Sequence, residues 1–253
     1  MATAIITGAS SGIGREIAKI LSGMGYDLIL AARRGDKLKE LKNELSGSVE
    51  IMSIDLSKEE NCYSLFDRCH DKDIEILVNN AGFGAFGEFS GTDISRDMEM
   101  IDLNICAVHI LTKLFLSEFK RKNCGKILNV ASAAGFMSEG PMLSTYYATK
   151  AYVLSLSRSI AKELKKAGSK VTVSALCPGP VKTEFDAVCG VDFQGVGMSA
   201  EKCAEIGISG MMKGKKVIIP GIVMKAGKFF TKVLPDCVLG EFAYHFQKAK
   251  RKD

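Results

Sequence analysis

The sequence of 253 residues predicts an α/β protein in which a doubly wound parallel sheet lies between two layers of helices. Short apolar segments alternate along the chain with longer amphipathic segments, which is typical of βαβ units. The short segments are apolar throughout, as expected for strands that are covered on both faces. No repeat, low-complexity tract or linker divides the chain, so we expect a single domain over residues 1–253.

Seven segments fit the strand pattern, and they are Ala4–Thr7, Asp27–Ala31, Glu50–Ile54, Ile74–Asn79, Lys126–Val130, Val171–Leu176 and Val217–Ile219. Helical periodicity fills the intervals between them, most clearly at Gly14–Gly23, Lys37–Leu45, Met98–Leu116 and Tyr146–Lys166.

Residues 184–213 interrupt this alternation. Glu184–Gly197 is glycine-rich and irregular, and Ser199 has the position of an N-cap for a short helix. An irregular insertion at this point predicts a lid over the substrate.

Residues 222–253 form a basic C-terminal extension that contains an amphipathic stretch, Lys225–Lys248, interrupted at Pro235. The formal net charge of the chain is +5, and much of the excess lies in this extension. A solvated tail and a contact with an anionic membrane surface or an acyl carrier are both consistent with it. No nucleic-acid motif accompanies the charge, so we expect no nucleic-acid partner.

The cysteines and histidines do not form a metal-binding pattern. The eight cysteines include no C-x-x-C pair, and the three histidines do not cluster near them, so no metal site is expected. Scattered cysteines fit a reducing compartment. The N-terminal residues lack a signal-peptide pattern, and no run of about 20 apolar residues predicts a membrane span. We therefore expect a cytoplasmic protein without a transmembrane segment.

A glycine-rich turn follows the first predicted strand and precedes the first helix. Glycines let backbone N–H groups approach a pyrophosphate, and the helix N-terminus adds partial positive charge. A purely structural turn is the alternative, but the position between strand and helix favours a dinucleotide site. The candidate contacts are Gly8, Ser10, Ser11, Gly12, Ile13 and Gly14.

The end of the second strand indicates which dinucleotide binds. NAD-binding sites usually carry an acid there for the ribose 2′-OH. Here Ala32 takes that place and Arg33 and Arg34 follow. Guanidinium groups suit a 2′-phosphate, so the sequence predicts NADP(H), with Arg33 as its principal reader. The alternative is an exposed pair of charges at a helix start.

Two further strand ends complete the predicted cofactor site. Asp55, followed by Leu56, can accept from the adenine amino group, although an Asp after a strand is also a common N-cap. The small residues in Asn80, Ala81 and Gly82 leave room for a ribose close to the backbone.

Tyr146 and Lys150 are candidates for acid–base chemistry. Residues four apart share one helix face, whereas Tyr147 is turned away by about 100°. The lysine charge favours the phenolate and lowers the pKa of Tyr146. Such a tyrosine can act as an acid in carbonyl reduction or as a base in alcohol oxidation. A surface cation–tyrosine pair is the alternative.

Two polar residues extend this set. Ser132 follows the strand Lys126–Val130 and can donate to a substrate carbonyl, although a serine there is often only a turn residue. Asn104 lies inside a predicted helix, where a buried amide needs partners. It can hold a water that relays protons toward Lys150.

These pieces together resemble the short-chain dehydrogenase/reductase family, in its short single-domain branch. The similarity runs from Thr7 to about Thr183 and rests on ordered motifs, which are TGASSGIG at 7–14, DL at 55–56, NNAG at 79–82, Asn104, Ser132, YYATK at 146–150 and PGPVKT at 178–183. The resemblance implies a Rossmann-like fold of about seven parallel strands in three αβα layers, and NAD(P)-dependent hydride transfer.

By position, the resemblance implies that Tyr146 is the catalytic acid/base and that Lys150 also binds the nicotinamide ribose. It implies that Ser132 polarises the carbonyl and that Asn104 completes a proton relay. The nicotinamide amide would be held by Pro178, Gly179, Val181 and Thr183.

The chain departs from the family pattern at two places. Ser11, before Gly12, is not basic, so the NADP(H) prediction rests on the two arginines. The basic extension follows Val217–Gly221 where tetrameric members often end, so a homodimer is as well supported as a homotetramer.

The predicted substrate is a lipophilic ketone or alcohol of the steroid or fatty-acyl type. Apolar residues cluster in the segments expected around the nicotinamide, and the candidates for substrate contact are Phe83, Phe136, Met142 and Phe185, with Ser132 and Tyr146. Ordinary core packing is the alternative for the apolar residues. For the whole protein, the alternative to an enzyme is an NADP(H)-binding regulator or scaffold without turnover.

Overall fold

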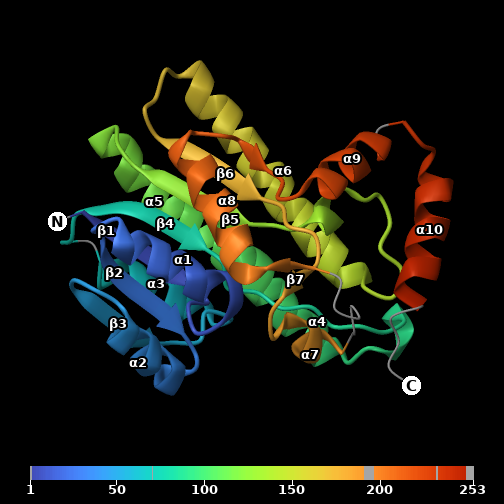
Figure 1. The fold of residues 1–253 in the computed structure, drawn as a ribbon, viewed down its shortest axis with the longest axis horizontal. Coiled ribbons are helices and arrows are strands. Elements are labelled where there is room, and N and C mark those ends of the chain that lie inside the picture. The colour runs from blue at the N-terminus through green and yellow to red at the C-terminus, as the bar shows by residue number, and fades with distance from the viewer. Residues whose placement is uncertain (1, 70, 191–196, 232, 249–253) are drawn as a thin grey trace.

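The computed structural model describes residues 2–69, 71–190, 197–231 and 233–248. Within them one parallel sheet has the strand order β3-β2-β1-β4-β5-β6-β9 (Figure 1). Its strands are β1 (Thr3–Thr7), β2 (Asp27–Ala32), β3 (Val49–Ser53), β4 (Ile74–Asn79), β5 (Lys126–Val130), β6 (Thr172–Leu176) and β9 (Val217–Ile218). The predicted doubly wound, Rossmann-like fold is confirmed, and each predicted strand end lies within one residue of the observed end.

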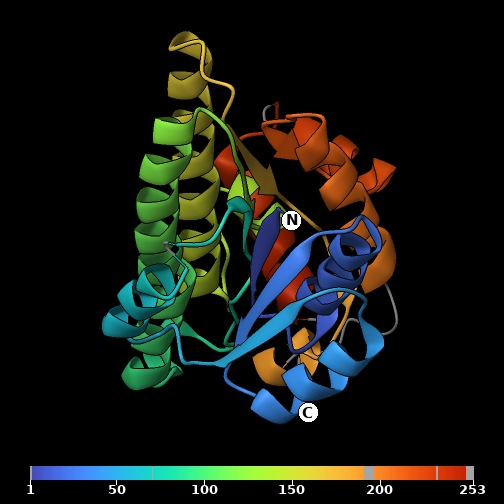
Figure 2. The same cartoon turned by 90° about the vertical axis from the view of Figure 1, so that its left-hand side faces the viewer.

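Helices cover both faces of the sheet, as Figure 2 shows in a view turned by 90°. One layer contains α1 (Gly12–Gly23), α2 (Gly35–Glu44) and α8 (Ala200–Met212). The other contains α3 (Glu59–Asp67), α4 (Ile94–Ile101), α5 (Val108–Lys122) and α6 (Ser144–Lys166).

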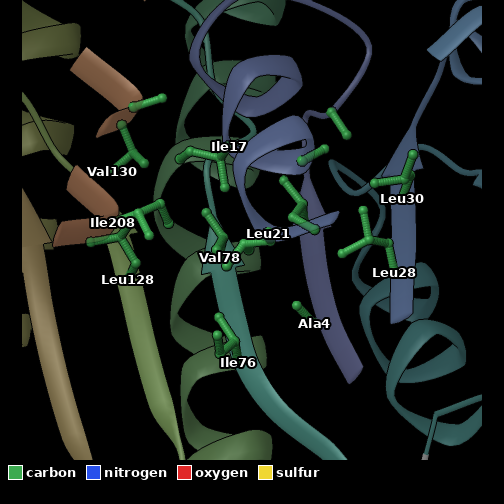
Figure 3. Packing of buried hydrophobic residues seen from close by; sticks show 14 of the residues in the cluster. Ala4, Ile17, Leu21, Leu28, Leu30, Ile76, Val78, Leu128, Val130 and Ile208 are labelled. Carbon is green, nitrogen blue, oxygen red and sulfur yellow. The ribbon is translucent and has the colours of Figure 1, made fainter. Parts of the chain in front are cut away.

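The two cores follow from the alternation of side chains along each strand. Ala4 and Ile6 of β1 pack with α1 and α8, whereas Ile5 between them packs into the opposite core. Figure 3 shows Ile17 and Leu21 of α1 over the first of these faces. A strand that is buried on both sides must be apolar at every position, which explains the pattern in the sequence.

The predicted helix Met98–Leu116 is part of a longer helix, Ile94–Lys122, which changes to π-helix over Asp102–Ala107. By length and composition this helix could cross a membrane. Its apolar side chains, including Met100, Leu111 and Phe119, are instead buried against the sheet. It is therefore a core helix.

The region predicted as a lid, residues 184–213, contains several secondary-structure elements. α7 (Phe185–Cys189) follows β7 (Val181–Lys182), and β7 pairs with β8 (Met198–Ser199). Residues 191–196 lie outside the described residues. Ser199 caps α8 by accepting from the Lys202 N–H. α8 buries one side in the core, and a lid role for residues 184–213 stays a prediction.

The C-terminal extension forms two helices, α9 (Ile222–Phe230) and α10 (Asp236–Lys248), which stand at one end of the molecule (Figure 1). Leu239 and Ala243 of α10 are buried. The backbone of Gly240 lies against the Glu139 carboxylate, which would have to shift to admit a Cβ at this position. The described part of the extension is therefore folded against the body of the protein.

Candidate active site

A cavity of about 1240 Å³ opens at the carboxyl ends of the strands. The strand order reverses between β1 and β4, and ligands of open parallel sheets bind at such a switch point. The volume exceeds the range of about 300–1000 Å³ that is usual for a single small ligand. It is large enough for a dinucleotide together with a substrate.

The turn between β1 and α1 forms a cradle that only glycine permits. Gly8 and Gly12 have φ angles of 66° and 55°. A Cβ on Gly8 would lie 2.8 Å from Ala81 Cα, and one on Gly14 would lie 2.5 Å from the Gly8 carbonyl oxygen. Among the described residues, Ser11 is the N-cap of α1 without making a side-chain capping bond. The helix N-terminus thus presents backbone donors that suit a pyrophosphate.

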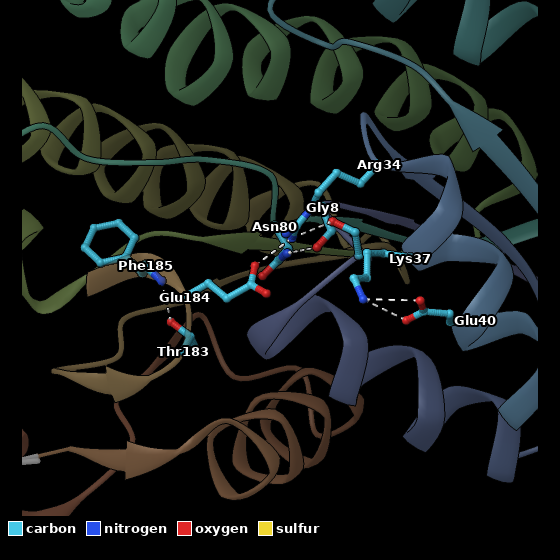
Figure 4. A network of polar contacts seen from close by, with 9 residues as sticks. Gly8, Arg34, Lys37, Glu40, Asn80, Thr183, Glu184 and Phe185 are labelled. Atoms are coloured by element: carbon cyan, nitrogen blue, oxygen red, sulfur yellow. Dashed lines mark hydrogen bonds and ion pairs between the residues drawn. The ribbon is translucent and has the colours of Figure 1, made fainter. Parts of the chain in front are cut away.

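Thr7 joins β1 to β4 beside this cradle, a role that the sequence did not reveal. Its Oγ1 accepts from the N–H groups of Asn80 and Ala81 at 3.0 and 3.1 Å, and donates to the Val78 carbonyl at 3.3 Å. Asn80 Nδ2 donates in return to the carbonyls of Thr7 and Gly8 at 3.0 and 3.1 Å. Figure 4 shows the contact between Asn80 and Gly8. These bonds fix the backbone that carries Asn80, Ala81 and Gly82.

The two arginines after β2 stand exposed at the cavity edge, each held by a carboxylate. Arg33 Nη1 lies 2.8 Å from Glu99 Oε1. Arg34 Nη2 lies 2.7 Å from Glu184 Oε2 and donates to Ser10 Oγ at 3.2 Å (Figure 4). The hydrogen bond from Arg34 lowers the pKa of Glu184.

Asp55 and Leu56 line the cavity, as predicted for an adenine contact. The Asp55 side chain also makes a local turn, because its Oδ1 accepts from the N–H and the hydroxyl of Ser57 at 3.1 and 2.9 Å. The second oxygen of the carboxylate leaves acceptor capacity for a ligand.

Ser132, Tyr146 and Lys150 meet in the cavity wall. Lys150 Nζ donates to the Val130 carbonyl at 3.0 Å and lies 5.8 Å from the centroid of the Tyr146 ring. Ser132 Oγ accepts from the Ala134 N–H at 3.1 Å, which leaves its hydroxyl hydrogen for other partners. The strand end of β5 and the first turns of α6 bring these three side chains together.

The electrostatics of this group differ from the sequence-based expectation. Burial raises the pKa of Tyr146, while the hydrogen bond with Ser132 acts in the opposite direction. Burial also lowers the pKa of Lys150 to about 8. A poorly solvated site disfavours both the charged phenolate and the charged ammonium. The expectation that Lys150 lowers the pKa of Tyr146 toward neutrality is therefore not met. Burial thus favours the neutral phenol of Tyr146.

Asn104 is fully buried in the π-helical segment behind the cavity. Its Oδ1 accepts from the Phe83 N–H at 3.1 Å, and its Nδ2 donates to the Phe83 carbonyl at 2.9 Å and to Thr149 Oγ1 at 3.1 Å. Both amide hydrogens are used, so only an oxygen lone pair remains for a water. The side chain ties the segment after β4 to α6, and the proton relay stays a prediction.

The predicted site residues, all of them described, divide between the cavity wall and its surroundings. Three do not line the cavity, namely Gly14, Asn104 and Met142. Met142 has a φ of 66°, and its carbonyl accepts from the Gly87 N–H, so this residue forms a turn. The others line the wall, including Ile13, Phe83, Phe136, Pro178, Gly179, Val181, Thr183 and Phe185. The Phe185 ring lies 5.4 Å from that of Tyr146.

The sequence did not identify the residues that α9, α10 and the turn between them contribute to the wall. They include Val223, Met224, Phe230, Leu234, Val238, Leu239, Phe242 and Gln247. Tyr147 also lines the cavity, and its hydroxyl accepts from Gln247 Nε2 at 2.8 Å. The apolar positions of the amphipathic Lys225–Lys248 stretch could have indicated that this segment packs against the body of the protein.

Comparisons with known proteins agree with this geometry. The family described as short chain dehydrogenase matches residues 2–190. An uncharacterized oxidoreductase of Bacillus subtilis is 34% identical over 183 residues, which cover 71% of this chain and 68% of that protein.

Two solved structures have the same fold over nearly the whole chain. A short-chain dehydrogenase from Sphingobium yanoikuyae, in complex with NADPH, has a TM-score of 0.81 and 30% identity over 93% of this chain and 97% of its own. A bulky-bulky ketone specific alcohol dehydrogenase from Comamonas testosteroni has a TM-score of 0.78 and 27% identity over 92% of each chain. The chain therefore belongs to the short-chain dehydrogenase/reductase family.

Proposed function

We propose that this oxidoreductase uses NADP(H) to interconvert a bulky lipophilic ketone and its secondary alcohol. The observation that carries the proposal is the meeting of Ser132, Tyr146 and Lys150 in the wall of a cavity that also contains the glycine cradle. When bound, the nicotinamide supplies or accepts the hydride.

The side chains of this site handle the proton and the oxygen. Tyr146 is neutral because burial raises its pKa, and it gives its proton to the substrate oxygen during reduction. The Ser132 hydroxyl donates a hydrogen bond to the same oxygen as negative charge develops there. Lys150 has further N–H groups besides the one bonded to Val130, and these suit the ribose hydroxyls of the cofactor.

The preference for NADP(H) is supported by Arg33 and Arg34 at the cavity edge. The ion pairs of Arg33 with Glu99 and of Arg34 with Glu184 are exposed and therefore weak. A 2′-phosphate could replace the two carboxylates as the partner of the guanidinium groups. The relative from Sphingobium yanoikuyae was solved with NADPH.

A bulky substrate is supported by the size of the cavity and by its aromatic and aliphatic wall, which includes Phe136, Phe185 and Phe230. The relative from Comamonas testosteroni is described as specific for bulky-bulky ketones. A cytoplasmic location and a homodimer or homotetramer are also part of the proposal. The alternative of a regulator without turnover has less support, because Ser132, Tyr146 and Lys150 are all in place.

The test is a spectrophotometric assay of NADPH oxidation with ketones graded by size and polarity. Tyr146→Phe is expected to bind NADPH normally in a fluorescence titration and to lose turnover by about 10²-fold or more. The matched control is Tyr147→Phe, which removes the neighbouring hydroxyl and should keep most of the activity. Turnover by Tyr146→Phe at the rate of the unchanged protein would refute the assignment.

A further inference from the structure

The two C-terminal helices and the turn between them expose large apolar side chains, and we name these residues together the α9–α10 face. Its exposed fractions are high, at 84% for Ile222, 76% for Val223, 63% for Phe229, 53% for Phe230, 62% for Val233 and 67% for Phe242. Single exposed apolar residues are common on proteins, but a cluster of this kind marks a contact with a protein or a membrane. The helices that carry it stand at one end of the molecule (Figure 1).

The net charge of the C-terminal extension, taken from its sequence, indicates the partner. The extension carries seven basic residues against three acids, Asp236, Glu241 and Asp253. It therefore holds +4 of the net charge of +5. α9 contains Lys225 and Lys228 and no acid. A second copy of the chain would bring the same positive charge to the contact, whereas an anionic lipid surface would attract it.

The α9–α10 face is continuous with the cavity. Val223, Phe230 and Phe242 are at least half exposed and also line the cavity, so they form its rim. Phe229 and Val233 are exposed outside the cavity wall. The rim of the cavity is thus part of the α9–α10 face.

We propose that the α9–α10 face docks on an anionic lipid bilayer, with Phe229 and Val233 inserted at the headgroup boundary. Phenylalanine beside lysine on a short helix is the composition of helices that lie in a membrane interface. In this orientation the rim of the cavity meets the lipid, and a lipophilic substrate passes between bilayer and cavity. The passage of substrate rests on the proposed function, and the docking does not.

The experiment uses the absence of tryptophan from the sequence. Phe229→Trp places the single tryptophan of the full chain on the docking face, where it can be excited apart from the six tyrosines. Its emission should shift to the blue on vesicles of phosphatidylcholine with about 30 mol% phosphatidylglycerol, and not on pure phosphatidylcholine. Brominated lipids should quench it, and salt should reverse the shift. The matched control is Tyr63→Trp on α3, where the side chain is 43% exposed and no shift is expected.

A second variant measures the contribution of the face. Phe229→Ser with Val233→Ser should weaken binding to the anionic vesicles by about tenfold or more, while turnover of a short, water-soluble ketone stays unchanged. Three results would overturn the proposal: no binding to anionic vesicles at low salt, binding without a shift for Phe229→Trp, or a shift without vesicles that grows with protein concentration. The last would mean that a second copy covers the face. Because binding is measured without turnover, an inactive protein that still docks would refute only the proposed function.

Discussion

The buried amine of Lys150 destabilises the folded protein, and its removal should make the protein more stable. The side chain is 6% exposed, and burial lowers its pKa from 10.5 to about 8. Each pKa unit corresponds to about 1.4 kcal/mol, so the penalty is about 3 kcal/mol below pH 8. Lys150→Met keeps the apolar stem but takes this donor away from the buried Val130 carbonyl, which costs about 1–2 kcal/mol.

We therefore expect Lys150→Met to raise the free energy of unfolding by about 1–2 kcal/mol at neutral pH while it abolishes turnover. The sign of the pH dependence follows from the lowered pKa. Between about pH 8 and 10.5 the unfolded chain still binds a proton that the folded protein has lost, so the unchanged protein gains stability as the pH rises. The advantage of the variant should disappear over this interval.

Urea denaturation of the cofactor-free protein, followed by circular dichroism at neutral pH and at about pH 10, measures both effects. The control is Lys162→Met on the same helix, where the lysine is exposed and its replacement should change the free energy of unfolding little. The reasoning would be refuted if Lys150→Met were less stable at neutral pH, or if its difference from the unchanged protein were the same at both pH values.

Three further predictions concern the cofactor site and its support. Arg33→Ala should weaken NADPH binding by about tenfold, with little effect on NADH binding, in a fluorescence titration. Arg121→Ala, which is remote from the site, should change neither affinity. An unchanged preference for NADPH in Arg33→Ala would exclude Arg33 as the residue that binds the 2′-phosphate. Gly14→Ala should abolish binding of both dinucleotides, because its Cβ would meet the Gly8 carbonyl oxygen, and normal affinity in the same titration would contradict the cradle. Asn104→Ala should lower the free energy of unfolding by about 2–4 kcal/mol, because it leaves the buried N–H and carbonyl of Phe83 without this partner. Urea denaturation measures the change, and a decrease smaller than the error of the assay would contradict this structural role.

The features that the sequence predicted correctly depend on local patterns. A strand buried on both faces is apolar at every position, and a turn with φ above zero at Gly8 and Gly12 needs glycine. The spacing of Tyr146 and Lys150 places both on one side of α6 regardless of the rest of the fold.

The features that the sequence did not predict depend on contacts between distant segments. Burial among residues of separate segments, including Phe185 and Cys189, raises the pKa of Tyr146, and no local pattern reports it. Met142 was chosen for its apolar neighbours, but its backbone turns it out of the cavity wall. The amphipathic stretch of the extension was visible, but its place over the cavity depends on tertiary packing.

The hydrogen bond between Gln247 and Tyr147 joins residues that are 100 positions apart. α10 is the last described element to be synthesised, and it supplies one wall of the cavity. A chain cut before Asp236 would keep every strand of the sheet together with Ser132, Tyr146 and Lys150, but its pocket would stand open to water on one side. During translation the fold can thus form well before the pocket is closed, and proteolysis near the exposed Pro235 would undo the closure without unfolding the sheet.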